Sequence, residues 1–79
     1  MASYRIVIRR SAEEELMAVP FPFRRQINGL IFKLKKDPRP SAAERIAEGE
    51  HFRLRVDGWR VVYEVEDESL VVTIIAIVR

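Results

Sequence analysis

The strongest structural signal in the sequence lies in residues 52–65, which read FRLRVDGWRVVYEV. Apolar and polar side chains alternate on both sides of Asp57-Gly58, a dipeptide that favours two-residue hairpin turns. A period of two is typical of a β-strand with one buried face. The sequence therefore predicts two antiparallel strands, residues 52–56 and 59–65, joined by a tight turn.

A two-residue turn also fixes which residues of the two strands face each other. It gives the hairpin one apolar face and places Arg53, Arg55 and Arg60 on the other, with Arg55 directly opposite Arg60. Like charges in that position destabilise a sheet by roughly 0.2–1 kcal/mol. A bound anion would explain the pair, because guanidinium groups bind phosphate bidentately while they stay charged. The alternative is an exposed, solvated face whose arginines are splayed apart or pair with Glu64 and Glu50.

The flanking sequence supplies the other elements. Residues 4–9 are rich in β-formers, and residues 70–78 form the near-continuous apolar run of a central strand. Two helices are expected between them. The first begins at Ser11 with a capping box and stops at Pro20, and the second, of about 15 residues, begins with Pro22 in its first turn. The apolar face of the second helix consists of Phe23, Ile27, Leu30, Ile31 and Leu34.

The expected fold class is α+β with the element order β-α-α-β-β-β. Two antiparallel helices pack on one face of a four-stranded, largely antiparallel sheet. Residues 37–50 show no clear period and indicate at most a short helix from Ser41. We expect residues 1–79 to form a single domain.

The place of the C-terminus depends on the last turn. If a four-residue loop joins the last two strands, Val65 pairs with Leu70. Arg79 then joins the arginine face, together with Ile75 and Ile77. A β-bulge would invert this assignment.

Composition excludes several classes of protein. The chain is 48% hydrophobic and has one histidine and no cysteine, so a disulfide framework is excluded and neither a metal nor a cofactor is expected. No secretory signal is visible and no apolar run approaches the ~20 residues that span a bilayer, so we expect a cytoplasmic protein without membrane contacts. Basic residues in the second helix form either a solvated face or a phosphate-binding surface. They are Arg24, Arg25, Lys33, Lys35 and Lys36.

Together these features resemble the RelE/ParE toxin superfamily. The resemblance covers nearly all of the chain: the Tyr-Arg-Ile-Val-Ile strand, the Ser-Ala-Glu-Glu-Glu-Leu helix, a second helix ending in Leu-Lys-Lys-Asp-Pro and, most specifically, the hairpin of residues 52–65. It implies a toxin of a type II toxin–antitoxin module that a cognate antitoxin holds inactive. RelE-like members cleave mRNA in the ribosomal decoding site, whereas ParE-like members poison DNA gyrase.

The resemblance also implies roles for single residues. Arg53, Arg55 and Arg60 correspond to basic residues that RelE-like ribonucleases use around the scissile phosphate, and the family's late arginine falls on or beside Arg79. Two features depart from RelE. Arginines replace its lysines at positions 53 and 55, and the sequence stops before a C-terminal tyrosine that RelE uses for stacking and catalysis. Arginine stays protonated, so it suits phosphate binding better than proton transfer.

Cleavage of RNA by its own 2′-hydroxyl needs a base, an acid and stabilisation of the phosphorane charge. The arginines fit the last role, and the candidate bases are His51, Glu44, Glu48 and Glu50. Strand parity places His51 on the arginine face. Three functions remain open: a ribosome-dependent mRNA endoribonuclease, a ParE-like inhibitor of DNA gyrase, and a non-catalytic nucleic-acid-binding module. The expected partners are a cognate antitoxin together with the ribosome and mRNA, or with gyrase.

Overall fold

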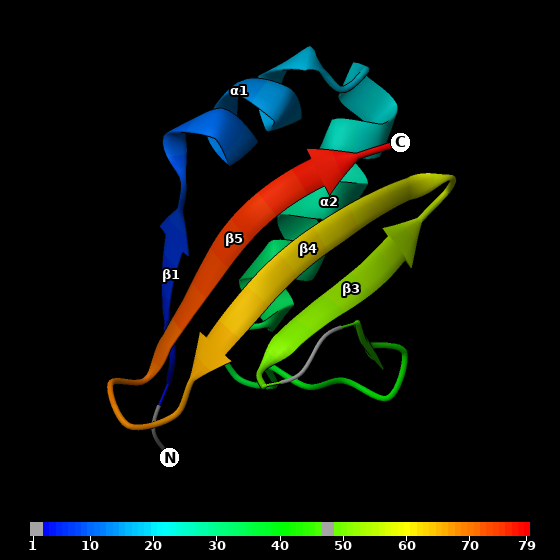
Figure 1. The fold of residues 1–79 in the computed structure, drawn as a ribbon. Helices are drawn as coiled ribbons and strands as arrows, with labels where there is room; N and C mark the ends of the chain where they lie inside the picture. Colours follow the sequence, from blue (N-terminus) through cyan, green and yellow to red (C-terminus); the bar gives the residue numbers. More distant parts are fainter. Residues whose placement is uncertain (1–2, 47–48) are drawn as a thin grey trace.

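One five-stranded sheet organises the structure, a computed structural model that describes residues 3–46 and 49–79. The elements are β1 (Arg5–Ile8), α1 (Arg10–Ala18), α2 (Phe21–Lys33), β2 (Glu44–Arg45), β3 (His51–Val56), β4 (Trp59–Glu66) and β5 (Val71–Val78). The strand order is β1-β5-β4-β3-β2, with β4 in the centre (Figure 1). β1 lies parallel to β5 and the other neighbours are antiparallel. The predicted α+β class, with a largely antiparallel sheet, is confirmed.

The turn between β3 and β4 forms as predicted. Asp57 has a φ angle of 46° and Gly58 one of 84°, as a type I′ hairpin turn requires. Arg55 pairs with Arg60 and Leu54 pairs with Val61, so the predicted register of the hairpin is confirmed. The sheet face opposite the helices therefore receives the arginines.

The sequence predicts four strands, and the fifth, β2, lies in the stretch without a clear period. Glu44 pairs with Arg53 and Arg45 pairs with Phe52, which extends the sheet beyond β3. A strand of two residues is too short to show alternation in a sequence. The short helix predicted from Ser41 is wrong.

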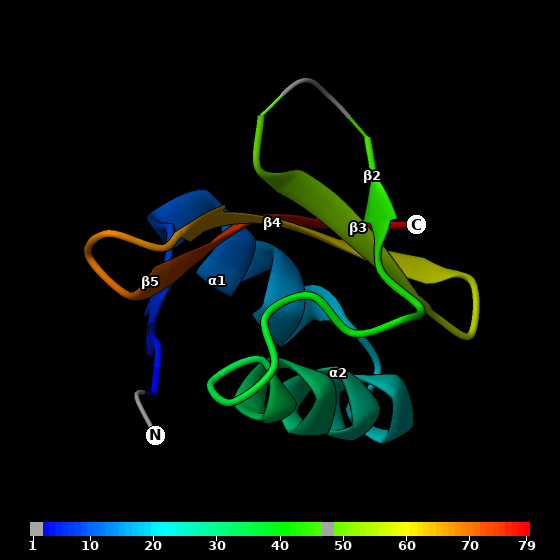
Figure 2. The ribbon, with the colours of Figure 1, turned by 90° about the horizontal axis from the view of Figure 1, so that it is seen from below.

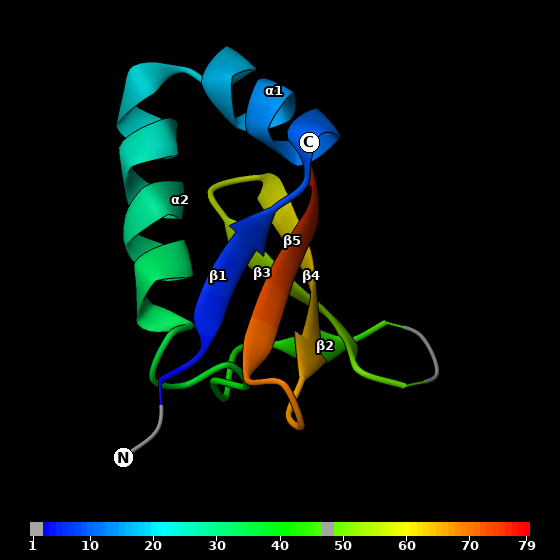
Figure 3. The same ribbon diagram turned by 90° about the vertical axis from the view of Figure 1, so that its left-hand side faces the viewer.

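Both helices cover the same face of the sheet (Figures 2 and 3). α1 packs against β5 and buries Ala12 and Leu16. α2 buries Ile27 and Ile31, which confirms the helical period of its apolar residues. No helix among the described residues has the length and apolar character that a membrane crossing needs.

The start of α1 differs from the prediction. Arg9 is the N-cap residue and no side chain caps the helix, so the capping box at Ser11 is wrong. The helix already begins at Arg10, directly after β1, which places Ser11 inside the first turn rather than at the N-cap. The start of α2 agrees with the prediction, because Pro20 is its N-cap and Pro22 lies in its first turn.

A β-bulge divides β5 into two halves. Tyr63 pairs with Ile74, whereas the preceding Val62 pairs with Ala76. Ile75 is therefore the extra residue on β5. Such a bulge inverts the faces of all residues that follow it.

The bulge changes which residues of β5 face the helices. Ile77, predicted on the outer face, is only 3% exposed, whereas Val78 is 37% exposed. The turn before β5 also differs, because Val65 pairs with Val72 and not with Leu70. The predicted register of the last strand is therefore wrong, and with it the face assigned to the C-terminal end of β5.

The core lies between the helices and the sheet, and Tyr63 is its largest fully buried side chain. The Tyr63 ring stacks on Phe52 with 5.6 Å between centroids, and its hydroxyl donates a hydrogen bond to the Pro38 carbonyl oxygen at 2.8 Å. Burial raises the pKa of Tyr63 to about 12, because the phenolate would lose its hydration. Tyr63 thus anchors the segment that precedes β2.

Candidate nucleic-acid interface

Three arginines share the face of the hairpin that points away from the helices. They are Arg53 and Arg55 on β3 and Arg60 on β4. The intervening residues of β3, Phe52 and Leu54, are buried against the helix side. Because side chains alternate along a strand, the arginines are directed outward. The structure therefore brings these three candidates together as predicted from the hairpin.

Glu44 of the edge strand β2 lies beside Arg53 and Arg55 on this basic face. Its Oε1 is 3.1 Å from Arg53 Nη2 and 3.6 Å from Arg55 Nε. The alternative interpretation, in which the arginines pair with Glu64 and Glu50, names the wrong partners, because the acidic residue beside Arg53 and Arg55 comes from β2. Glu44 was identified as a candidate base, but only the pairing of β2 with β3 places it beside Arg53.

His51, at the start of β3, also lies on the arginine face. Its Nε2 is 3.2 Å from Glu64 Oε2, the residue directly opposite on β4. The other ring nitrogen, Nδ1, is buried and has no hydrogen-bond partner among the described residues. His51, Arg53 and Arg55 thus lie in a row on the outer face of β3, with Glu44 of β2 opposite Arg53. Glu48, another candidate base, lies outside the described residues.

Arg79 reaches the same end of the hairpin from a different side. Because of the bulge, its guanidinium lies over the ring of Trp59, 5.2 Å from the centroid, instead of on the arginine face. Arg60 Nη2 donates a hydrogen bond to the Arg79 carbonyl oxygen. A hollow of about 290 Å³ lies between these groups at the hairpin tip. It is lined by Arg55, Gly58, Trp59, Arg60 and Arg79.

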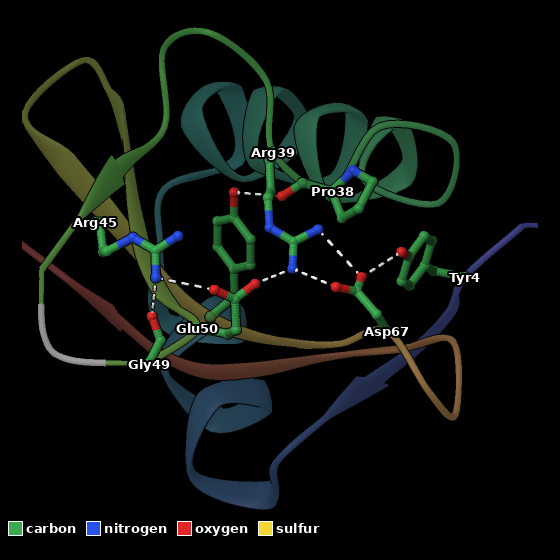
Figure 4. Close-up of polar contacts among 8 residues, drawn as sticks. Tyr4, Pro38, Arg39, Arg45, Gly49, Glu50 and Asp67 are labelled. Atoms are coloured by element: carbon green, nitrogen blue, oxygen red, sulfur yellow. Dashed lines mark hydrogen bonds and ion pairs between the residues drawn. The ribbon is translucent and has the colours of Figure 1, made fainter.

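A second cluster of charges holds the segment that carries Glu44 (Figure 4). Arg39 lies between Glu50 and Asp67, with Arg39 Nη2 2.8 Å from Asp67 Oδ2. Tyr4 donates its hydroxyl to Asp67 Oδ1 at 2.5 Å, and Arg45 of β2 pairs with Glu50 Oε2 at 2.9 Å. This chain of contacts, the Arg39 network, links β2 to the start of β3 and to the turn after β4. It thereby fixes the strand on which Glu44 lies.

The pKa values of the Arg39 network move in the directions that keep Asp67 and Arg39 charged and Tyr4 protonated. Hydrogen bonds from Arg39 and then from Tyr4 hold the pKa of Asp67 below its ordinary value. The hydrogen bond to Asp67 raises the pKa of Tyr4 and also that of Arg39. The network was missed in the sequence because its members are up to 63 positions apart.

The basic residues of α2 lie away from the hairpin arginines. They lie along α2 and in the turn after it. The helix covers the opposite face of the sheet (Figure 2). Arg24 Nη1 donates to the Met17 carbonyl oxygen at 3.1 Å, and Lys35 lies over Phe32 at 5.3 Å from the ring centroid. The five predicted residues therefore lie apart from the hairpin arginines, on α2 and in the turn after it: Arg24, Arg25, Lys33, Lys35 and Lys36. Among the described residues, no three His, Cys, Asp or Glu side chains lie close enough to hold a metal ion.

Comparison with known proteins places this geometry in context. The model of the family "ParE toxin of type II toxin-antitoxin system, parDE" matches residues 6–79. The intact E. coli RelBE toxin–antitoxin complex contains a chain that is 26% identical, with a TM-score of 0.84 over 96% of this chain and 95% of that one. The isolated E. coli RelE toxin is 23% identical, with a TM-score of 0.87 over 96% of this chain and 83% of that one.

A third solved structure extends the likeness to another organism. The Mycobacterium tuberculosis toxin–antitoxin complex RelBE2 contains a chain that is 18% identical, with a TM-score of 0.84 over 99% of both chains. At such low identity the match concerns the fold alone. No curated protein sequence matches the chain.

Proposed function

The chain belongs to the ParE toxin family of type II toxin–antitoxin systems, and we propose that it is an endoribonuclease that cleaves mRNA on the ribosome. The observation that carries the proposal is the Glu44 carboxylate, 3.1 Å from Arg53 and 3.6 Å from Arg55 on an exposed sheet face. A proton acceptor and two permanently charged phosphate ligands meet there.

These groups supply the steps that RNA cleavage requires. Glu44 accepts the proton of a ribose 2′-hydroxyl, whose oxygen attacks the adjacent phosphorus. Arg53 and Arg55 bind the phosphorane oxygens as negative charge develops on them. The P–O5′ bond then breaks, and the 5′-oxygen takes a proton from His51, which serves as the general acid. The products are a 2′,3′-cyclic phosphate and a 5′-hydroxyl.

The charge arrangement of the hairpin supports an anionic ligand. Arg55 and Arg60 lie directly opposite each other, an arrangement that costs stability when nothing lies between them. The Arg55 side chain is 66% exposed, so a phosphate reaches it without displacing core residues. Arginine also stays protonated in proteins and so remains a positively charged phosphate ligand.

A separate surface is available for the ribosome. The basic residues of α2 and its following turn lie on the far side of the sheet from Glu44. We assign Lys33, Lys35 and Lys36 to contacts with phosphates of ribosomal RNA, which need no sequence recognition. The ribosome then presents the mRNA to the hairpin face and fixes its orientation.

The proposal also includes a cognate antitoxin that binds this toxin. The E. coli and M. tuberculosis relatives are described as complexes of a toxin with an antitoxin. By analogy, an antitoxin of this chain binds the folded toxin and prevents cleavage. Its addition to the purified toxin is expected to abolish cleavage at a one-to-one ratio.

The direct test uses programmed ribosomes. The purified protein is incubated with ribosomes and an mRNA of known sequence, and the new mRNA ends are mapped and tested for a 5′-hydroxyl. We expect cleavage that requires the ribosome and leaves this end. Intact mRNA at stoichiometric toxin would contradict the proposal.

DNA gyrase is the second candidate target, because the matching family model is that of ParE from parDE. A supercoiling assay with purified gyrase separates the two functions. Inhibition of supercoiling by a protein that leaves ribosome-bound mRNA intact would favour gyrase.

A further inference from the structure

Glu50 lies between two arginines, directly before the start of β3 (Figure 4). Its Oε1 is the ion-pair partner of Arg39 Nη2, and its Oε2 lies 2.9 Å from Arg45 Nη1. The Glu50 side chain is only 35% exposed. Both carboxylate oxygens are therefore engaged with guanidinium groups, so Glu50, a candidate base by sequence, is poorly placed to accept a proton from RNA.

The contact between Glu50 and Arg45 reaches β2. Arg45 and Glu44 make up this strand, and neighbouring side chains of a strand point to opposite faces of the sheet. Arg45 lies over the buried Phe52 ring, 5.1 Å from its centroid, on the face that the helices cover. Glu44 lies on the other face, beside Arg53. Side-chain contacts thus hold β2 from both faces of the sheet.

The backbone pairing of β2 is short. The strand has two residues and lies at the edge of the sheet, so it makes few ladder hydrogen bonds. At its end, the Ile46 amide donates to the His51 carbonyl oxygen at 3.2 Å. The exposed ion pair between Glu44 and Arg53 adds little stability. The position of Glu44 therefore depends on the contacts of Arg45 on the covered face.

We propose that Glu50 is a positioning residue for RNA cleavage: it holds Arg45, which keeps β2 in register with β3 and Glu44 beside Arg53. Glu50 does not touch the RNA. Arg39 holds Glu50 from its other oxygen. A shift of about 1 Å in the position of a reacting group can cost about 10²-fold in rate, so a small movement of β2 is sufficient to slow the reaction. The inference rests on the proposed function, in which Glu44 is the base.

The experiment is a double-mutant cycle in the single-turnover assay on programmed ribosomes. It compares the wild type, Glu50→Gln, Glu44→Gln and the double variant. Glutamine keeps the size of the side chain, but its amide nitrogen cannot accept a hydrogen bond from an arginine. We expect Glu50→Gln to lower the cleavage rate roughly tenfold. Binding of mRNA should stay within about twofold of the wild type, because Arg53 and Arg55 keep their charges.

The cycle distinguishes a positioning role from a general loss of structure. In the Glu44→Gln background, Glu50→Gln should change the remaining rate by no more than about twofold, because the group that it positions is already absent. Arg45→Lys keeps a positive charge opposite Glu50 and is expected to cleave within about threefold of the wild type. Glu13→Gln is the matched control, since Glu13 is an exposed glutamate on α1; its rate should equal that of the wild type.

Hydrogen exchange measures the position of β2 without any cleavage. The Ile46 amide should exchange faster in Glu50→Gln than in the wild type and at the wild-type rate in Glu13→Gln. Unchanged exchange of this amide in Glu50→Gln would overturn the inference, because β2 would then be held without Glu50.

The cleavage assay has two further results that count against the inference. A wild-type rate for Glu50→Gln would overturn it, and so would an equal loss of rate from Glu50→Gln in both backgrounds, because Glu50 would then act independently of Glu44. Neither result affects the proposed function. That proposal fails separately if Glu44→Gln cleaves at the wild-type rate, and loss of cleavage by Glu50→Gln alone would then make Glu50 the base.

Discussion

The Glu44 carboxylate and the Arg53 guanidinium face each other across the pairing of β2 with β3, with 3.1 Å between Oε1 and Nη2. The Glu44 side chain is 52% exposed, and exposed ion pairs contribute about 0–1 kcal/mol to stability. The pair therefore has little structural value. Its position on a face that already holds Arg55 and Arg60 is better explained by chemistry with an anionic substrate.

Replacement of Arg55 by glutamine is expected to stabilise the fold and weaken the site. The change removes the like charge opposite Arg60, so the free energy of unfolding should rise by roughly 0.2–1 kcal/mol. RNA affinity and cleavage should fall, because one phosphate ligand is lost. Arg5→Gln is the matched control, since Arg5 is an exposed arginine on β1 opposite Val71. Urea unfolding measures the stability; a destabilised Arg55→Gln protein would show that the opposed pair has a structural role.

Replacement of Arg39 by methionine is expected to release β2. The change removes the contacts with Glu50 and Asp67 and should lower the free energy of unfolding by about 1 kcal/mol. Hydrogen exchange offers a local measurement, because the Ile46 amide donates to the His51 carbonyl oxygen at 3.2 Å beside β2. This amide should exchange faster in Arg39→Met. Unchanged exchange would mean that the Arg39 network does not hold β2.

The raised pKa of Tyr63 predicts that the protein loses stability at alkaline pH. Its pKa in the folded protein is about 12, raised from an ordinary value of 10.0. Below pH 10 both states keep the proton and the full contribution is present. Between pH 10 and about 12 the unfolded chain ionises first, so stability falls as pH rises. In Tyr63→Phe this part of the decline should be missing, although the variant loses about 1–3 kcal/mol at neutral pH because the Pro38 carbonyl has no donor. Equal pH slopes in the two proteins would argue against a buried, protonated phenol.

Charge reversal on α2 is expected to affect ribosome binding without affecting the chemical step. Lys33, Lys35 and Lys36 replaced together by glutamate should weaken binding to ribosomes and make it less dependent on salt. Cleavage by the bound protein at saturating concentration should remain near the wild-type rate. Ribosome affinity equal to that of the wild type over a salt series would show that this basic surface has another purpose.

The hairpin was predictable because its determinants are local. Asp57-Gly58 favours one turn type, and the alternation on either side sets the register with no help from distant residues. The prediction that Arg53, Arg55 and Arg60 share one face of the sheet follows directly from this register. The helices were recognisable for the same reason, although the start of α1 at Arg10 was set by the end of β1 and not by the capping residue at Ser11.

The errors concern features that depend on contacts between distant residues. The bulge at Ile75 has no local signature, and burial of Ile77 against the helices selects it. β2 is too short to show a period and exists only through its pairing with β3. The position of Glu44 follows from that pairing, so the sequence could identify it as a candidate base but could not place it beside Arg53.

The most direct measurement is the single-turnover rate of mRNA cleavage on programmed ribosomes by the wild type and by Glu44→Gln. Glutamine keeps the size of the side chain but cannot accept the 2′-hydroxyl proton. We expect the rate to fall by roughly 10²- to 10⁴-fold while mRNA binding is retained. A Glu44→Gln protein that cleaves at the wild-type rate would contradict the assignment of Glu44 as the base and of the arginine face as the cleavage site.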